Sequence, residues 1–94
     1  MLTIRRLIWD PRNLAHITRH QITMDEVEQV CHGKPLIRQG YLDRLVLIGP
    51  TNAGRVLAAV LEYIEEDSYY VVTARPADRK ERQLYQEAQG EIES

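Results

Sequence analysis

The alternation of apolar and polar positions predicts a strand and two short helices in the first third of the chain. Thr3–Trp9 is rich in β-branched and apolar residues and stops at Asp10-Pro11, which is typical of a strand followed by a capped helix start. A second helix is expected after Thr23, because Thr23 and Glu26 have the spacing of a capping box and Ile22 and Val27 flank it as a hydrophobic staple. Gly33 is expected to end that helix.

From residue 35 to residue 76 the pattern changes to strands. Four strands are expected, at Leu36–Gln39, Arg44–Gly49, Arg55–Tyr63 and Ser68–Arg75. The gaps between them are short, which favours antiparallel pairing, because parallel crossovers need a dozen or more residues.

A last helix is predicted after Asp78, with Glu81 as its capping partner and Gly90 as its expected end. The predicted order is therefore β-α-α-β-β-β-β-α, in one domain that spans residues 1–94. This order predicts an α+β fold, an antiparallel sheet with helices packed mainly on one face. The middle strands are apolar on both faces, so the other face needs a partner or a groove.

Composition and charge restrict the class of protein. A chain of 94 residues with 44% hydrophobic and 28% charged residues is an ordinary globular protein with one small core. A single cysteine, Cys31, excludes an internal disulfide, and the longest apolar run is too short to cross a membrane, so we expect a cytoplasmic protein. The net charge is −2, yet a basic stretch lies at residues 75–82 between two acidic ones.

Three motifs carry a resemblance to a known family. They are Trp9-Asp10-Pro11 ahead of a helix that ends in Arg19-His20, then Gly54-Arg55-Val56-Leu57, and finally Thr73-Ala74-Arg75-Pro76-Ala77 running into Arg79-Lys80-Glu81-Arg82 and Tyr85. In this order they resemble the BrnT family of bacterial toxins. The resemblance implies a RelE-like ribonuclease fold, inhibition of translation by RNA cleavage, and a cognate antitoxin. It also implies that DNA is bound only through the toxin–antitoxin complex.

The basic residues of the last motif suit RNA chemistry. Metal-independent cleavage needs a base for the 2′-hydroxyl proton, positive charge for the phosphate, and an acid for the leaving oxygen. We predict Arg75 and Arg79 as catalytic residues, since the guanidinium fork pairs with two phosphate oxygens. Lys80 and Arg82 are predicted to bind RNA. A solvated helix start, salt-bridged to Asp78 and Glu81, explains the same residues equally well.

The remaining candidates each have a structural alternative. His20 is predicted as the acid–base residue, because histidine titrates near neutrality, although a histidine at a helix end also suits the helix dipole. Tyr85 is predicted to bind RNA, by stacking on a base or donating a proton, with a core or edge role as the structural alternative. Arg44 and Arg55 stand at strand starts, where they contact RNA, contact an antitoxin, or block strand pairing.

No cofactor or metal is predicted. His16 and His20 share a helix face, but the pattern lacks the glutamate of zincins and a second spaced cysteine pair. Two functions from different classes remain open: an endoribonuclease toxin, and a non-catalytic interaction module of the same fold. The residue 73–82 run favours the toxin, whereas the acidic charge balance and the Gln21 that follows His20 favour the module.

Overall fold

A five-stranded sheet with the strand order β1-β5-β4-β3-β2 forms the centre of the protein. The computed structural model describes residues 2–93, with the side chains of residues 2–90. The elements are β1 (Arg6–Ile8), α1 (Pro11–Arg19), α2 (Met24–His32), β2 (Leu36–Gln39), a 3-10 turn (Tyr41–Asp43), β3 (Leu45–Pro50), β4 (Val56–Glu65), β5 (Ser68–Pro76) and α3 (Arg79–Glu93). The predicted order of helices and strands is confirmed.

Strands β2 to β5 pair antiparallel with their sequence neighbours, as the short connections predict. Strand β1 differs, because it pairs with β5 in the parallel direction. The crossover from β1 to β5 contains most of the chain, so no local sequence signal announces this pairing. The sheet is therefore mainly antiparallel, with one parallel strand at its edge.

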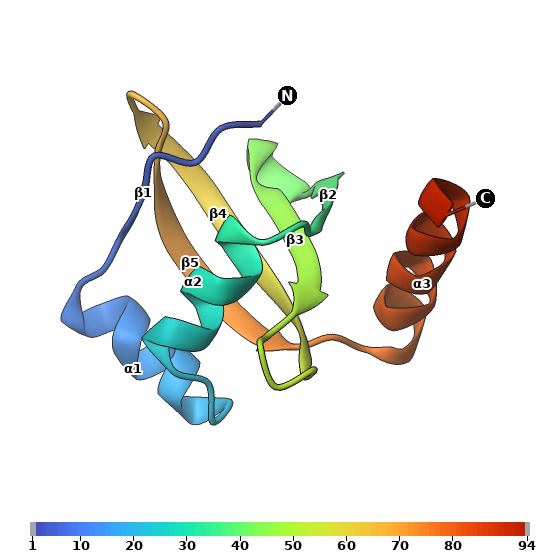
Figure 1. Cartoon of the computed structure of the whole chain (residues 1–94). Helices are drawn as coiled ribbons and strands as arrows, with labels where there is room; N and C mark the ends of the chain where they lie inside the picture. The colour runs from blue at the N-terminus through green and yellow to red at the C-terminus, as the bar shows by residue number, and fades with distance from the viewer. Residues whose placement is uncertain (1, 94) are drawn as a thin grey trace.

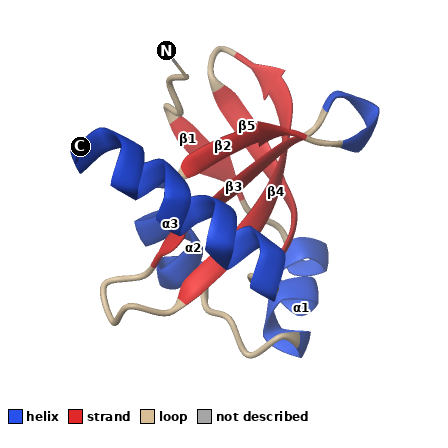
Figure 2. Cartoon of the chain, turned by 90° about the vertical axis from the view of Figure 1, so that its right-hand side faces the viewer, coloured by secondary structure: helices blue, strands red, loops and turns tan. Residues whose placement is uncertain are grey.

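Helices cover both faces of the sheet, but unequally. Helices α1 and α2 lie together on one face, where α1 contacts β5 and α2 contacts β3 and β4 (Figure 1). Helix α3 lies over the opposite face and contacts β3 (Figure 2). Two of the three helices share a face, as predicted, and α3 covers part of the face for which the sequence predicted a partner or a groove.

The alternation of side chains along β4 divides the core into two clusters. Leu57 and Leu61 point into the larger one, under α1 and α2, whereas Ala58 points into the smaller one, under α3. The larger cluster also contains Ile17, Ile22, Val27, Val30, Cys31, Leu47 and Val71. The smaller one contains Ile48, Ala58 and Ala77, with Leu36, Val46, Val56 and Tyr85 packed against it. The face under α3 therefore buries much less apolar surface.

All three helix starts carry side-chain caps. Thr23 and Glu26 bond to each other's backbone amides, and Asp78 and Glu81 do the same, as the sequence predicts. Asp10 caps α1 as predicted, but its reciprocal partner is Asn13, which the sequence did not reveal. The backbone N–H of Asn13 holds the pKa of the Asp10 carboxyl below its ordinary value.

The predicted end of α3 at Gly90 is wrong, because the helix continues to Glu93. Gly90 does not take the left-handed conformation that ends a helix. A Cβ at this position would meet nothing within 4 Å, so close packing does not require glycine here either.

Asn13 is expected to stabilise the junction between β1 and α1. Its side chain is fully buried, donates to the Ile8 carbonyl at 2.8 Å and accepts from the Asp10 amide at 2.9 Å. Asn13→Ala removes the side-chain hydrogen bond of each of these backbone groups, so we expect it to lower the free energy of unfolding by about 2–3 kcal/mol in urea titrations. The exposed Asn52, replaced by alanine, should change it by less than about 0.5 kcal/mol. Equal losses of stability in Asn13→Ala and in the Asn52 variant would contradict the role of Asn13 at this junction.

Candidate functional site

The end of β5 and the start of α3 are joined by a two-pronged ion pair. Arg75 donates from both terminal nitrogens to Glu81, at 2.6 Å and 2.9 Å. The same carboxylate accepts the Asp78 backbone N–H at 2.9 Å. The hydrogen bonds from Arg75 lower the pKa of Glu81, and Glu81 raises the pKa of Arg75, so both groups are charged near neutral pH.

This pair limits the chemistry of both residues. Glu81 is a poor proton acceptor, because its lowered pKa and its three hydrogen bonds favour the ionised, occupied carboxylate. The donor fork of Arg75 is filled by two carboxylate oxygens, in the arrangement that two phosphate oxygens would adopt. A phosphate that binds Arg75 must therefore displace Glu81 or use the remaining donor groups of Arg75.

The first turn of α3 carries three cations, Arg79, Lys80 and Arg82. Arg82 donates to the Ala77 carbonyl at 2.7 Å and so holds the link between β5 and α3. Among the residues that the structure describes, Arg79 and Lys80 form no ion pair or side-chain hydrogen bond. Cations at a helix N-terminus add to the positive end of the dipole, which is unfavourable for the free helix and favourable for a bound anion.

Tyr85, one turn further along α3, packs against the smaller cluster and is half-buried. This position favours the core role of the two roles that the sequence left open. Base stacking by Tyr85 stays a prediction.

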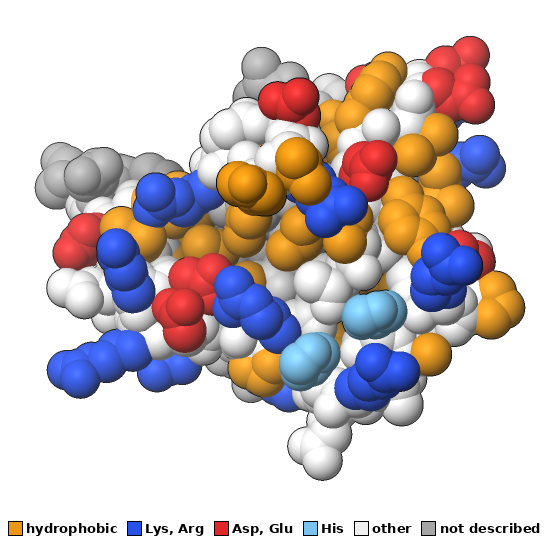
Figure 3. All heavy atoms as spheres, turned by 180° about the vertical axis from the view of Figure 1, so that it is seen from behind, with side chains coloured by type: hydrophobic (Ala, Val, Ile, Leu, Met, Phe, Trp, Pro, Cys, Tyr) orange, Lys and Arg blue, Asp and Glu red, His pale blue; other side chains and the backbone are white. Residues whose placement is uncertain are grey.

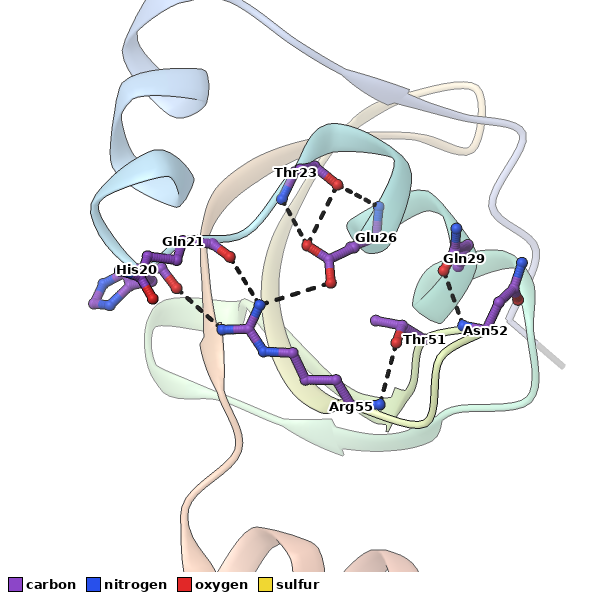
Figure 4. Close-up of polar contacts among 8 residues, drawn as sticks. All are labelled: His20, Gln21, Thr23, Glu26, Gln29, Thr51, Asn52 and Arg55. Atoms are coloured by element: carbon purple, nitrogen blue, oxygen red, sulfur yellow. Dashed lines mark hydrogen bonds and ion pairs between the residues drawn. The ribbon is translucent and has the colours of Figure 1, made fainter.

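Arg55 binds the backbone at the end of α1 (Figure 4). Its guanidinium donates to the Gln21 carbonyl at 2.8 Å and to the His20 carbonyl at 3.1 Å, and lies 3.6 Å from Glu26. An arginine beside the carbonyls that directly follow a helix also opposes the negative end of the helix dipole. This geometry gives Arg55 a structural role, and RNA binding by Arg55 stays a prediction.

His20 lies at the same end of the sheet as the β5–α3 junction. Its carbonyl binds Arg55, which precedes β4, and the Val56 carbonyl of β4 accepts the Ala77 amide at 3.0 Å. The imidazole is exposed and points away from Arg55 (Figure 4). Within the described part of the chain the ring makes no hydrogen bond, so its role in proton transfer stays a prediction.

Arg44 lies apart from the other candidates. It precedes β3 and faces Glu62 at 3.6 Å, whereas Arg55 precedes β4 at the opposite end of the β3–β4 ladder. The strand rise puts roughly 20 Å between these two ends. Arg44 and Arg55 therefore cannot contact the same phosphate.

Basic side chains lie on the side of the molecule that is turned away from the viewer in Figure 1. Seen from behind, Lys, Arg and His side chains lie across the lower half of the view, with Asp or Glu side chains among them and apolar side chains above them (Figure 3). The three histidines of the chain belong to α1, to the residue after it and to α2, so this band is not confined to the sheet face under α3. Sequence reasoning missed one basic residue on that sheet face, Arg38, which lines a groove of about 270 Å³ together with Lys80 and Glu81. The sequence feature that could have indicated Arg38 is the alternation of side chains along β2, which puts Leu36 and Arg38 on the same face of the sheet.

The described residues give little support to a metal site, a reactive cysteine or a membrane-spanning helix. Within residues 2–93, no three His, Cys, Asp or Glu side chains are placed to hold a metal ion. Cys31 is buried, as predicted, and burial raises its thiol pKa to about 12, so the reactive thiolate is disfavoured. No helix in this range is long and apolar enough to span a bilayer.

The ion pair at the junction predicts a pH-dependent stability. A carboxyl whose pKa is lowered by folding stabilises the protein above its ordinary pKa of 4.5, and this contribution disappears as the pH falls through the lowered value. We expect Glu81→Gln to cost about 1 kcal/mol at neutral pH, since Arg75 is partly exposed, and less as the pH falls below 4.5. Denaturant titrations at several pH values test this. The exposed Glu87→Gln should follow wild type, and a constant Glu81→Gln deficit at every pH would contradict it.

The hydrogen bonds of Arg55 at the end of α1 predict that removing its side chain lowers the stability of the fold. Arg55→Ala gives up two charged hydrogen bonds, so we expect the free energy of unfolding to fall by about 1–2 kcal/mol. Arg19→Ala removes an exposed neighbouring charge and should change it by less than about 0.5 kcal/mol. Unchanged stability in Arg55→Ala would contradict the structural role of this residue.

Comparison with known proteins identifies the fold. No family model and no curated protein sequence matches the chain. The structure is similar to the crystal structure of the ribonuclease toxin BrnT of Brucella abortus, with a TM-score of 0.64 and 22% sequence identity over 82% of this chain and 100% of that one. The chain therefore has the fold of the Brucella ribonuclease toxin, with all the helices and strands that the predicted order requires.

Proposed function

We propose that this chain is the RNA-cleaving toxin of a bacterial toxin–antitoxin pair. Two observations support the proposal together: the fold is that of a protein described as a ribonuclease toxin, and the β5–α3 junction offers cations to an anion. The second observation carries it, because fold alone does not fix activity. In this proposal the protein acts in the cytoplasm, where cleavage of RNA inhibits translation.

In the proposed reaction the ribose 2′-oxygen attacks the adjacent phosphorus, and the bond to the 5′-oxygen breaks. One proton leaves the 2′-hydroxyl and another reaches the departing oxygen, and His20 serves one of these transfers. Arg79 and Arg75 stabilise the charge on the phosphate, Arg75 after exchanging Glu81 for a phosphate oxygen. Lys80 and Arg82 attract the neighbouring phosphates. No step requires a metal.

The proposal includes a protein partner. A cognate antitoxin binds and inhibits the toxin, and DNA is bound only by the resulting complex. The Arg44–Glu62 end of the sheet, far from the junction, remains available for such a contact.

One observation favours the alternative, a non-catalytic interaction module. The guanidinium groups of Arg75, Arg82, Arg55 and Arg44 all face groups of the protein itself, so four of the predicted RNA contacts already have internal partners. In a module of this kind they only stabilise the fold, and the free cations of α3 bind a protein.

Arg79 separates the two functions, because its side chain is exposed and without a partner in the described residues. Controlled expression of the wild type in a heterologous bacterium should arrest growth and shorten transcripts. Arg79→Ala, at matched expression, should cleave RNA about a hundredfold more slowly and permit growth. Arg5→Ala removes the same charge from the far end of the sheet and should behave as wild type. Harmless accumulation of the wild type with intact RNA would favour the interaction module.

A further inference from the structure

A groove lies between α3 and the edge of the sheet that β2 forms. It lies where the first turns of α3 pass over β2 and β3 (Figure 2). Val46, Ile48 and Leu84 line it with apolar surface, and Arg38 of β2 and Lys80 of α3 line it with charge. Its volume of about 270 Å³ is just below the range of about 300–1,000 Å³ in which drug-sized ligands bind. It therefore suits a small group, such as one base.

The strand register explains this combination of surfaces. Arg38 pairs with Val46, and Leu36 pairs with Ile48, so these four side chains point to the same face of the sheet. The row that contains Ile48 continues through Ala58 to Arg75 on β5. The groove and the Arg75–Glu81 pair are consequently parts of one continuous surface, and Glu81 belongs to both.

The charges in the groove are unequally available. Glu81 is compensated by the charge of Arg75, whereas the Asp78 carboxylate accepts only the neutral Glu81 amide, at 2.8 Å, and keeps its negative charge. In contrast, Arg38 and Lys80 form no ion pair or side-chain hydrogen bond with any described residue. The uncompensated charges of the groove are thus the two cations Arg38 and Lys80 and the Asp78 carboxylate, a net charge of +1 beside an apolar surface, which suits a ligand with both an anion and a flat apolar part.

We propose that this groove binds one nucleotide of single-stranded RNA next to the cleaved phosphate. The base lies on Val46 and Leu84, above the buried Ile48, and Arg38 and Lys80 contact the phosphates of the strand. This inference rests on the proposed function for the identity of the ligand as RNA, and it adds Arg38 as a binding residue. Arg38 contributes to affinity and to the position of the strand, without contacting the reacting atoms.

The test uses the full chain and a short single-stranded RNA with 2′-O-methyl groups, which lacks the attacking hydroxyl and cannot be cleaved. In methyl NMR spectra we expect the signals of Val46, Ile48 and Leu84 to shift as this RNA binds. Arg38→Ala should weaken binding about tenfold, the effect of one lost charged hydrogen bond. It should also lower the slope of log affinity against log salt by about 0.7. Arg5→Ala, which removes an equal charge elsewhere, should leave affinity and slope unchanged.

Three results would overturn the inference: no shift of the three methyl groups, equal effects of Arg38→Ala and Arg5→Ala, or equal binding of a polyglutamate peptide of the same charge. Cleavage of unmodified RNA, measured in parallel, separates this inference from the proposed function. Cleavage by wild type without groove shifts overturns the inference alone. Groove shifts without cleavage overturn the proposed ribonuclease activity and support the groove as an RNA site.

Discussion

The carboxylate of Glu81 determines how the two parts of the candidate site meet. It binds the guanidinium of Arg75 at the end of β5 and the Asp78 amide at the start of α3, so one side chain joins sheet and helix. Helix α3 has few other attachments, because the apolar cluster beneath it is small. Together with the hydrogen bonds from Arg82 to the Ala77 carbonyl and from the Ala77 amide to the Val56 carbonyl, this contact holds the start of α3 against the sheet beside the groove. The same contact fills the donor fork of Arg75, so the interaction that builds the site also competes with an anion for it.

The unequal faces of the sheet explain why such a site exists. On one face, α1 and α2 bury large side chains against β3, β4 and β5, which provides most of the hydrophobic stabilisation. On the other face, Ala58 and Ala77 are small and α3 covers only the part near β2 and β3. The rest stays open and carries arginine and tyrosine among its apolar residues. A fold of this size thus obtains stability from one face and leaves the other available for binding.

The parts of this structure that the sequence predicts are those determined by neighbours along the chain. The Thr23–Glu26 and Asp78–Glu81 caps, the stop at Gly33 and the antiparallel strands all follow from residues a few positions apart. The parallel pairing of β1, the separation of Arg44 from Arg55 and the commitment of Arg55 to α1 depend on contacts between distant segments. Arg38 was missed for the same reason, because its significance comes from Lys80, 42 positions away in the sequence. Gly90 shows the opposite error, in which a residue that often ends helices lies inside one.

The negative net charge of the chain is compatible with an anion site, because electrostatic attraction to a bound phosphate is local. Screening at physiological salt limits the effect of exposed charges to about 8 Å. The acids of the β4–β5 turn, Glu65 to Asp67, lie at the far end of the sheet from the junction, so they contribute little there. Near the junction, Arg75 compensates the charge of Glu81, and Asp78 keeps its charge, whereas Arg38, Arg79 and Lys80 form no ion pair or side-chain hydrogen bond with the described residues. The uncompensated charges at this surface are therefore three cations and one carboxylate, so a phosphate there meets a local excess of positive charge.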